Sequence, residues 1–571
     1  MKKNLLVLLL AGALFALIPA HVSGQTLNTP KGNKTQMHQE TPDDPYLPNA
    51  HLNKKTGPAY KVRNSGFFST QVNVDEFGQN IYDDAANEPS IGIDPTDPQR
   101  MVIGWRQFDN INSNFRQAGH AYTTDGGETW TFPGVINPGI FRSDPVLDTD
   151  AEGTFYYNSL SVDNQNNYWC DVFKNGEGGF EWDEGTYAQG GDKQWMVIDK
   201  SGGMGDGHIY SFWTSNWSIC YPQAFTRSID EGASYEDCVE VPGDPYWGTM
   251  AVGPDGELYV VGAGQFGSLT VTKSTMAQNP AFPVSWNFTT QAYVDGELNG
   301  WTNVNPAGLM GQANICVDQS DGPGRGYVYV LASVDRLSTN DPGDVMFARS
   351  TNGGSTWDPP VRINNDLGNN KVQWFGTMSV APNGRIDVVW LDTRNGGSGS
   401  VMSALYYSFS LDQGETWSDN EQLSEPFDPH VGWPNQEKMG DYFDMKSDEE
   451  SAHLAWCGTF NGEQDVYYAR ITPVITSVHQ KPQSVNTPAI SCLPNPFTGS
   501  ATISYYIPET GHVDVSIFDM YGKKINTLVN GHQQGGTHTV SLTGDQLTGG
   551  IYICRITAGG ITKTCTVVHI K

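Results

Sequence analysis

Four short segments of the chain repeat one pattern, and this repeat constrains the fold more than any other feature. They are residues 123–130 (TTDGGETW), 228–235 (SIDEGASY), 350–357 (STNGGSTW) and 410–417 (SLDQGETW). The third residue, Asp or Asn, can accept hydrogen bonds from its own turn, and the glycine permits a positive φ. The closing Trp or Tyr can pack between neighbouring sheets. The pattern therefore predicts a structural turn that recurs along the chain.

A second repeat consists of an apolar run, a turn rich in Asp or Gly, and another apolar run. Its turns are centred on Asp97, Gly153, Gly207, Gly256, Gly326, Gly384 and Glu450, at intervals of 49–70 residues. The four segments above follow their turns by 23–28 residues, which predicts four-stranded sheets in a β-propeller. Seven turns predict seven blades, with six as the alternative. The last unit lacks an outer strand, which residues 67–74 could supply.

The four repeated segments resemble the Asp boxes of the sialidase superfamily. This resemblance implies an all-β, sialidase-like propeller in residues 63–471, although sialidases themselves have six blades. It also implies that Asp125, Asp230, Asn352 and Asp412 are structural residues away from any active site.

The N-terminus carries the pattern of a secretory signal peptide. Lys2 and Lys3 precede an apolar run at residues 5–18, and small residues precede a cleavage point at Gln25. The run is too short to cross a membrane, and we find no other stretch long and apolar enough to do so. We therefore expect a signal peptide at 1–24, an extended segment at 25–62 and an exported mature protein.

The chain after residue 471 has a different pattern. Residues 472–491 are polar and contain three prolines, which predicts a linker, and about 80 residues of alternating strands follow. LPNPF, GHVDVSIFDMYGKKI, LTGGIYIC and TKTCTVVHIK, in this order, resemble the C-terminal sorting domain of Bacteroidetes type IX secretion. The resemblance implies a small antiparallel β-sandwich at 492–571, recognition by the type IX secretion machinery, removal during surface attachment, and a secreted or outer-membrane surface location.

A net charge of −30 argues against binding to nucleic acids or anionic membranes, and is compatible with cations, neutral glycans or basic proteins. The spacing of Cys220 with Cys238, and of Cys554 with Cys565, permits a disulfide in each pair or buried free thiols. The histidines show no spacing typical of a zinc site.

Propellers bind ligands where the innermost strands of the blades begin. Five of the seven units carry a carboxylate near this point: Glu88, Asp144, Asp192, Asp244 and Asp441. Five acids gathered at one channel mouth would raise one another's pKa values, pair with Lys193 or Arg142, or bind a cation such as Ca²⁺. Alternatively, each caps the turn that enters its strand.

The sialidase resemblance further implies three arginines that hold a substrate carboxylate, a Tyr nucleophile with a Glu partner, and an Asp acid/base. The sequence offers Arg142, Arg106 and Arg394 for the clamp. Tyr246 and Tyr442 stand beside the predicted acid ring, and Glu437 is near Tyr442 in sequence. The catalytic candidates are thus Glu88, Asp144, Asp244, Asp441, Tyr246 and Tyr442, with Asp192 and the three arginines as substrate-binding candidates. No combination reproduces the family's motif.

Two functions remain open on the sequence. The first is recognition or hydrolysis of extracellular glycans at the channel mouth, and the second is non-catalytic binding of protein or polymer partners. The fold does not separate them, because propellers support many unrelated functions.

Overall fold

The computed structural model describes residues 43–48, 50, 52, 54–175, 181–474, 489–493, 495–507, 510–544 and 547–570. The predicted signal peptide and most of the predicted linker lie outside these residues. The named elements of the described residues are all β-strands. These residues contain no helix that is long and apolar enough to cross a membrane. The chain divides into two compact units, Met1–Val474 and Ile475–Lys571.

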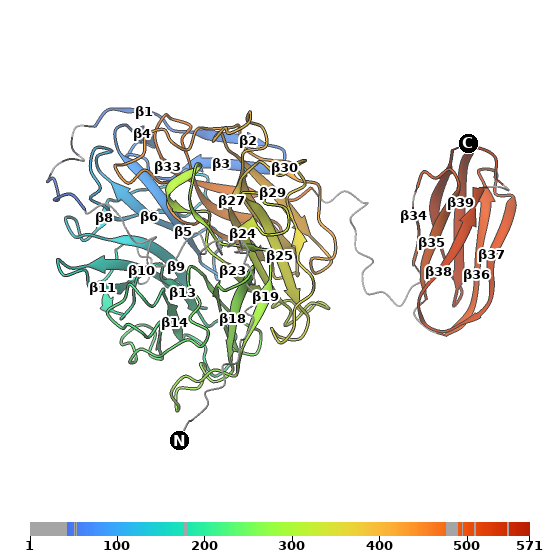
Figure 1. Ribbon diagram of the computed structural model, residues 1–571, viewed down its shortest axis with the longest axis horizontal. Coiled ribbons are helices and arrows are strands. Elements are labelled where there is room, and N and C mark those ends of the chain that lie inside the picture. The colour runs from blue at the N-terminus through green and yellow to red at the C-terminus, as the bar shows by residue number, and fades with distance from the viewer. Residues whose placement is uncertain are drawn as a thin grey trace, which may run out of the picture. The chain divides into compact units, whose positions relative to one another are not determined.

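The described part of unit 1 contains seven antiparallel sheets of three or more strands, which we number in chain order (Figure 1). The first is β5 (Ala85–Ile93), β6 (Met101–Phe108), β7 (Gln117–Thr123) and β8 (Val135–Ile136). The second is β9 (Ser143–Thr149), β10 (Phe155–Val162), β11 (Tyr168–Asn175) and β12 (Thr186–Tyr187). The third is β13 (Trp195–Ile198), β14 (Ile209–Phe212) and β15 (Phe225–Ser228). The fourth is β16 (Met250–Val252), β17 (Leu258–Ala263), β18 (Ser268–Ser274) and β19 (Phe288–Tyr293).

The remaining three sheets follow the same plan. The fifth is β23 (Asn314–Val317), β24 (Val328–Arg336), β25 (Asp344–Ser350) and β26 (Val361–Arg362), with β20 (Gly296–Glu297) also on β24. The sixth is β27 (Gln373–Val380), β28 (Ile386–Asp392), β29 (Ala404–Ser410) and β30 (Glu421–Gln422). The seventh is β31 (Asp444–Ser447), β32 (Ala452–Gly458), β33 (Asp465–Ile471), β3 (Phe67–Gln71) and β2 (Lys61–Asn64).

The first strands of the sheets form a closed circuit, because each contacts the first strand of the next sheet and β31 contacts β5. The seventh sheet joins the two ends of the unit, since β3 pairs with β33 from Phe67 opposite Ile471 to Gln71 opposite Tyr467 (Figure 1). The segment predicted to supply the missing strand therefore does so. Two ribbons complete the unit: β1 (Thr56–Pro58) with β4 (Gln79–Ile81), and β21 (Gly300–Thr302) with β22 (Asn305–Leu309).

The repeated turns have the local geometry that their residues favour. Gly256, between β16 and β17, and Gly384, between β27 and β28, have φ values of 78° and 83°, which a side chain at Cβ disfavours. In the segment after β29, Asp412 accepts hydrogen bonds from Thr416 N at 2.9 Å and Thr416 Oγ1 at 2.6 Å. Trp417 reaches the preceding sheet, with its ring 5.1 Å from that of Phe347. Asp125, Asp230 and Asn352 close equivalent turns.

Unit 2 consists of two antiparallel sheets. One is β34 (Ala489–Leu493), β35 (Ser500–Ile507) and β38 (Gly536–Thr543), and the other is β37 (Lys524–Gln533), β36 (Gly511–Asp519), β39 (Gly550–Ala558) and β40 (Ile561–His569). Alternate residues of both sheets share one apolar core, including Ile503 and Ile507 from the first and Val515, Ile517 and Ile556 from the second. Cys220 and Cys238 of unit 1 form a disulfide, whereas Cys554 and Cys565 of unit 2 are directly opposed free thiols.

Candidate functional site

The first strands of five sheets are entered through a residue in the left-handed region. These residues are Glu88, Asp144, Lys193, Trp247 and Phe375, with φ values of 53°, 46°, 58°, 54° and 56°. These five residues occupy equivalent positions in their repeats. In each repeat, the residue six positions later donates the backbone N–H that closes the turn between the first and second strands. Of the predicted acids, only Glu88 and Asp144 thus share one position. Asp192 and Asp441 come one residue earlier in their repeats, and Asp244 comes three residues earlier.

Four of the five predicted acids lie together with three cations, and we call these seven residues the mouth cluster: Glu88, Asp144, Asp192, Asp441, Lys193, Lys438 and Arg106. Lys193 Nζ lies 3.3 Å from Asp144 Oδ2, 3.2 Å from Asp192 Oδ1 and 3.0 Å from Asp441 Oδ2. Lys438 Nζ lies 2.9 Å from Asp441 Oδ2, and Arg106 Nε lies 3.0 Å from Glu88 Oε2. The ammonium groups therefore occupy the place between the carboxylates that a bound cation would take.

The electrostatics of the mouth cluster follow from this pairing. Burial raises the pKa of Asp441, but Lys193 and Lys438 outweigh it and hold that pKa well below its usual value. Burial lowers the pKa of Lys193, but the surrounding carboxylates raise it well above its usual value. Burial raises the pKa of Glu88 well above the ordinary range, against the opposing Arg106. Lys193 and Lys438 thus neutralise Asp144, Asp192 and Asp441, and Glu88 is paired with Arg106.

The prediction for Asp244 does not hold, because it is exposed and accepts a hydrogen bond from Ser215 Oγ at 2.8 Å. Three residues separate it from the left-handed position at Trp247, so the register that brings Glu88 and Asp144 inward leaves it outside. A carboxylate before a proline was too general a signal to align the repeats.

Two segments close the end of the ring at which the first strands begin. Leu309 N, in the ribbon β21–β22, donates to Asp441 Oδ1 at 2.8 Å. Asn305 of the same ribbon donates to Gly440 O at 2.8 Å and accepts from Met439 N at 2.9 Å. The ribbon and residues 434–441 thus cover the mouth cluster. Its acids have exposed fractions of 0% for Glu88, 1% for Asp144 and Asp441, and 5% for Asp192, so they are buried.

The two tyrosines proposed as nucleophiles are held by structural contacts. Tyr442 is buried, its hydroxyl donates to Pro145 O at 2.7 Å, and burial raises its pKa well above the usual value. Tyr246 packs edge-on against Trp247 at 4.8 Å, and burial raises its pKa as well. A lowered pKa is one way to activate a nucleophile, and both tyrosines have the opposite shift.

The three predicted arginines each pair with a different acid, and each of these acids belongs to the arginine's own sheet. Arg106 donates from Nε to Asn87 Oδ1 at 2.8 Å and contacts Glu88. Arg142 pairs with Asp171 and lies over the ring of Phe173. Arg394 pairs with Asp392 Oδ2 at 2.7 Å and lies over Tyr406. No carboxylate clamp is therefore assembled from Arg106, Arg142 and Arg394.

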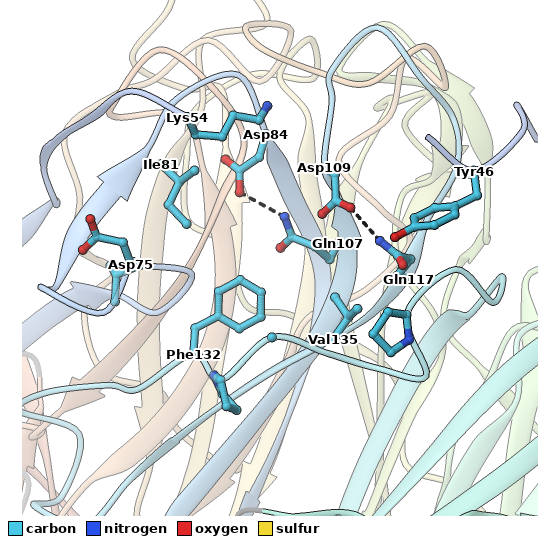
Figure 2. Close-up of a pocket in the computed structure, with 14 residues that line it drawn as sticks. Tyr46, Lys54, Asp75, Ile81, Asp84, Gln107, Asp109, Gln117, Phe132 and Val135 are labelled. Atoms are coloured by element: carbon cyan, nitrogen blue, oxygen red, sulfur yellow. Dashed lines mark hydrogen bonds between the residues drawn. The ribbon is translucent and has the colours of Figure 1, made fainter. Parts of the chain in front are cut away.

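An open cavity of about 330 Å³ lies instead beside the first sheet, and we call it the first-sheet cavity (Figure 2). Phe132 and Tyr46, both partly exposed, supply its aromatic surface, and Val135 and Ile81 add apolar contacts. Two carboxylate–amide pairs line it: Gln107 Nε2 donates to Asp84 Oδ2 at 3.0 Å, and Gln117 Nε2 donates to Asp109 Oδ2 at 2.8 Å. Apolar walls with a few placed polar groups are typical of small-molecule sites.

The N-terminal segment builds one wall of the first-sheet cavity. Asp43 accepts from Arg116 Nη2 at 3.0 Å, and Asp44 accepts from Asn114 N at 2.8 Å. These contacts carry Tyr46 onto the first sheet, where its ring lies 5.3 Å from that of Phe115. Sequence reasoning missed this site, because its residues come from a connecting segment, two strand ends and a loop. The pair Asp83–Asp84 before the first strand was the available signal.

A second cavity, of about 420 Å³, lies on the ring axis at the other ends of the first strands. Its walls are mainly apolar residues of these strands, such as Met250 and Met378. Its charges are matched, since Lys200 Nζ lies 2.8 Å from Asp148 Oδ1, and Lys446 Nζ lies 3.9 Å from Asp444 Oδ1. We expect this cavity to be the ring's solvent-filled centre.

A comparison with known protein families identifies the C-terminal unit. Residues 491–571 match the family described as the secretion system C-terminal sorting domain. This part of the chain is a type IX secretion sorting domain. It directs the protein through type IX secretion to the cell surface or outside, and it engages the secretion machinery. The resemblance inferred from the four C-terminal motifs is confirmed.

No curated protein matches the sequence. Among solved structures, the chain is similar to a protein of unknown function from Dyadobacter fermentans, with 13% identity, 72% of this chain and 99% of that chain covered, and a TM-score of 0.40. It is also similar to the endosialidase of phage phi92 (8% identity, 75% and 73% covered, TM-score 0.39). A Hadza microbial sialidase gives 13% identity, 65% and 76% coverage and a TM-score of 0.36. Scores this low assign no activity, so the site is judged on its own geometry.

Proposed function

We propose that this secreted protein is a non-hydrolytic binding protein that recognises extracellular glycans in the first-sheet cavity. The observation that carries the proposal is the lining of that cavity. Two partly exposed aromatic rings, of Phe132 and Tyr46, lie near the carboxylate–amide pairs Asp84–Gln107 and Asp109–Gln117. Aromatic faces pack on the C–H surface of a sugar ring, and the carboxylates and amides can bond to its hydroxyl groups.

The scaffold of this proposal is a seven-bladed propeller followed by a β-sandwich. The closed circuit of seven first strands supports seven blades over six, and the apolar core shared by the two sheets of unit 2 supports the sandwich. We place the propeller at 63–471, with residues 43–62 packed onto it, the linker at 472–491 and the sorting domain at 492–571. The aromatic residues of the Asp boxes, such as Trp417 against Phe347, are consistent with structural turns between blades.

Binding is favoured over hydrolysis by the state of the mouth cluster. A retaining or inverting glycosidase needs two carboxyl groups that reach the scissile bond, and a sialidase needs an accessible tyrosine. Here the carboxylates are neutralised by Lys193 and Lys438 and covered by β21–β22, and the Tyr442 hydroxyl is engaged with a backbone carbonyl. These contacts support a structural role for the predicted catalytic residues.

The test is a glycan array probed with the full chain, followed by calorimetry on the glycans that bind. Phe132→Ala and Tyr46→Ala should each weaken binding by about tenfold or more, because each removes an aromatic face worth about 1.4 kcal/mol or more. Phe77→Ala, at a ring that is 77% exposed in the β3–β4 turn, is the matched control and should bind normally. Melting curves establish that each variant is folded.

The same preparations should release no sugar from the glycans that they bind. Hydrolysis that is lost in Tyr442→Phe would overturn the proposal and return the site to the mouth cluster. Binding that Phe132→Ala and Tyr46→Ala leave unchanged in folded protein would overturn it as well.

A further inference from the structure

The charges around the first-sheet cavity are unbalanced, in contrast to those of the mouth cluster. Asp75, Asp84 and Asp109 line it, and Lys54 is the one cationic side chain among its described lining residues. Lys54 Nζ donates to the carbonyl of Asp83 at 2.6 Å. Figure 2 shows Lys54 and Asp84 with no interaction drawn between them. Behind Asp84 stand two further acids of the seventh sheet, Glu463 and Asp465. Among the described residues, Asp84 therefore lines the cavity without an ion-pair partner.

The charge imbalance is most evident at Asp84. Its exposed fraction is 2%, and Oδ2 accepts from Gln107, but Oδ1 has no hydrogen-bond partner. A buried carboxylate oxygen without a partner is costly, because it has lost its hydration and gained nothing in return. Burial raises the pKa of Asp84 well above its usual value, and Asp465 raises it further. A cationic group placed against Oδ1 would satisfy the oxygen and stabilise the charged form.

We propose that the first-sheet cavity binds an amino sugar, with the protonated amine against Asp84 Oδ1 and the sugar ring against Phe132 and Tyr46. The proposal rests on the function proposed above, and it names the class of glycan. The net charge of −30 acts in the same direction, because the summed field attracts a polycationic sugar chain.

The lining favours an amino sugar over the side chain of a basic peptide. The Asp109–Gln117 pair and the turn carboxylate Asp75 line the cavity in addition to Asp84 (Figure 2). A sugar ring carries hydroxyl groups on several sides and can bond to these groups while its amine contacts Asp84. A lysine side chain has one polar group, so it would satisfy Asp84 and leave the others to water.

Binding should also move a proton. In the free protein the groups that face Asp84 are Asp465 and Glu463, which raise its pKa, and Lys54, which lowers it. A bound ammonium lowers the pKa of Asp84 and so favours its ionised form, and binding releases a proton wherever the free carboxyl group holds one. The apparent enthalpy of binding will then depend on the ionisation enthalpy of the buffer, and affinity will fall as the pH is lowered.

The experiment is calorimetry on the full chain with three probes at about pH 6, where an aliphatic amine is protonated. The probes are a D-glucosamine tetramer, its fully N-acetylated counterpart, and trilysine. We expect the glucosamine tetramer to bind about tenfold or more tightly than the other two, with net proton release. Asp84→Asn should remove this preference, and Asp163→Asn, which removes one carboxylate from the β10–β11 turn, should retain it.

The outcomes separate the two proposals. Equal binding of both sugars that is lost in Phe132→Ala would overturn the amino-sugar inference and leave glycan binding in the cavity standing. Trilysine binding as tightly as the glucosamine tetramer would overturn the choice of an amino sugar. Absence of binding of either sugar would overturn the inference, and with an empty glycan array it would overturn the proposed function too. If Asp84→Asn does not fold, the preference of the wild-type protein for the glucosamine tetramer over its N-acetylated counterpart decides, and its absence contradicts the ammonium–Asp84 contact.

Discussion

The mouth cluster and the first-sheet cavity contain similar residues and have opposite electrostatic states. In the mouth cluster, four acids share Lys193, Lys438 and Arg106 and are covered by β21–β22. At the cavity, Asp84 keeps one oxygen without a partner and Lys54 is turned to a backbone carbonyl. Acids that the protein itself neutralises stabilise the fold, whereas acids left unmatched beside an open cavity are available to a ligand. The difference places the candidate site at the edge of the ring.

The largest effect should come from breaking the neutralisation of the mouth cluster. Lys193→Met leaves Asp144, Asp192 and Asp441 buried without their shared ammonium group, which should lower the free energy of unfolding by about 3–5 kcal/mol. Lys200→Met is the matched control, because Lys200 also pairs with a buried acid but is itself one-third exposed, and it should cost about 1 kcal/mol. Urea unfolding measures both. Equal losses would mean that the cluster has no special role in stability.

Asp465, behind the cavity, should respond to pH with a sign opposite to that of Asp441 in the mouth cluster. Burial raises the pKa of Asp465 from 3.8 to about 7, so the folded state binds its proton more tightly than the unfolded state. The resulting stabilisation is complete below pH 3.8 and is lost as the pH rises to about 7. Asp441, whose pKa is lowered, instead contributes stability above pH 3.8 that is lost in stronger acid.

Asp465→Asn therefore should make stability less dependent on pH. Between pH 5 and 7 the wild-type protein should lose on the order of 2 kcal/mol relative to this variant. The exposed Glu76→Gln is the control and should follow the wild type. If the free energy of unfolding depends on pH in the same way for Asp465→Asn and the wild type across this range, the acids behind the cavity are already neutralised.

A smaller effect is expected at the repeated turns, which belong to neither region. Asp412→Ala removes the acceptor for Thr416 N and Thr416 Oγ1 and should cost about 0.5–2 kcal/mol, by analogy with helix caps. Glycan affinity should not change, since this turn contributes no residue to the cavity. A folded variant with reduced affinity would show that the repeated turns take part in binding.

Calcium should have no effect on the melting temperature, either when added or when removed with EDTA. Lys193 and Lys438 occupy the space between the carboxylates, and within the described ranges no group of three or more His, Cys, Asp or Glu is arranged to hold a metal ion. A rise in melting temperature that saturates with calcium would contradict the pairing by lysines.

The repeats could be predicted from the sequence and the candidate site could not, for a physical reason. Turn residues act within a few positions of themselves, so the segment around Asp412 and the glycines at 256 and 384 predicted the strands around them. The outer strand at Phe67–Gln71 followed from counting strands. The sorting domain was recognisable because its motifs occur in order over 491–571.

The site depends on contacts between segments far apart in the chain. The neutralisation of an acid depends on residues far away in the chain. Lys438, for example, lies opposite Glu88 but is 350 positions from it in the sequence, so no local pattern predicts the contact. Aligning acids by a following proline also included Asp244, which is exposed, with Asp144, which is buried. Tyr46 joins Asp84 and Phe132 at the cavity because Asp43 and Asp44 fasten the N-terminal segment to the first sheet.

We expect ligands to bind in the first-sheet cavity and to leave the contacts of the mouth cluster unchanged. The most direct test is a crystal structure of the full chain grown with the glucosamine tetramer. It should show a sugar ring against Phe132 and Tyr46 with an amine nitrogen within hydrogen-bond distance of Asp84 Oδ1, and β21–β22 still closed over Lys193. Sugar bound among Glu88, Asp144 and Tyr442, with β21–β22 displaced, would contradict the account.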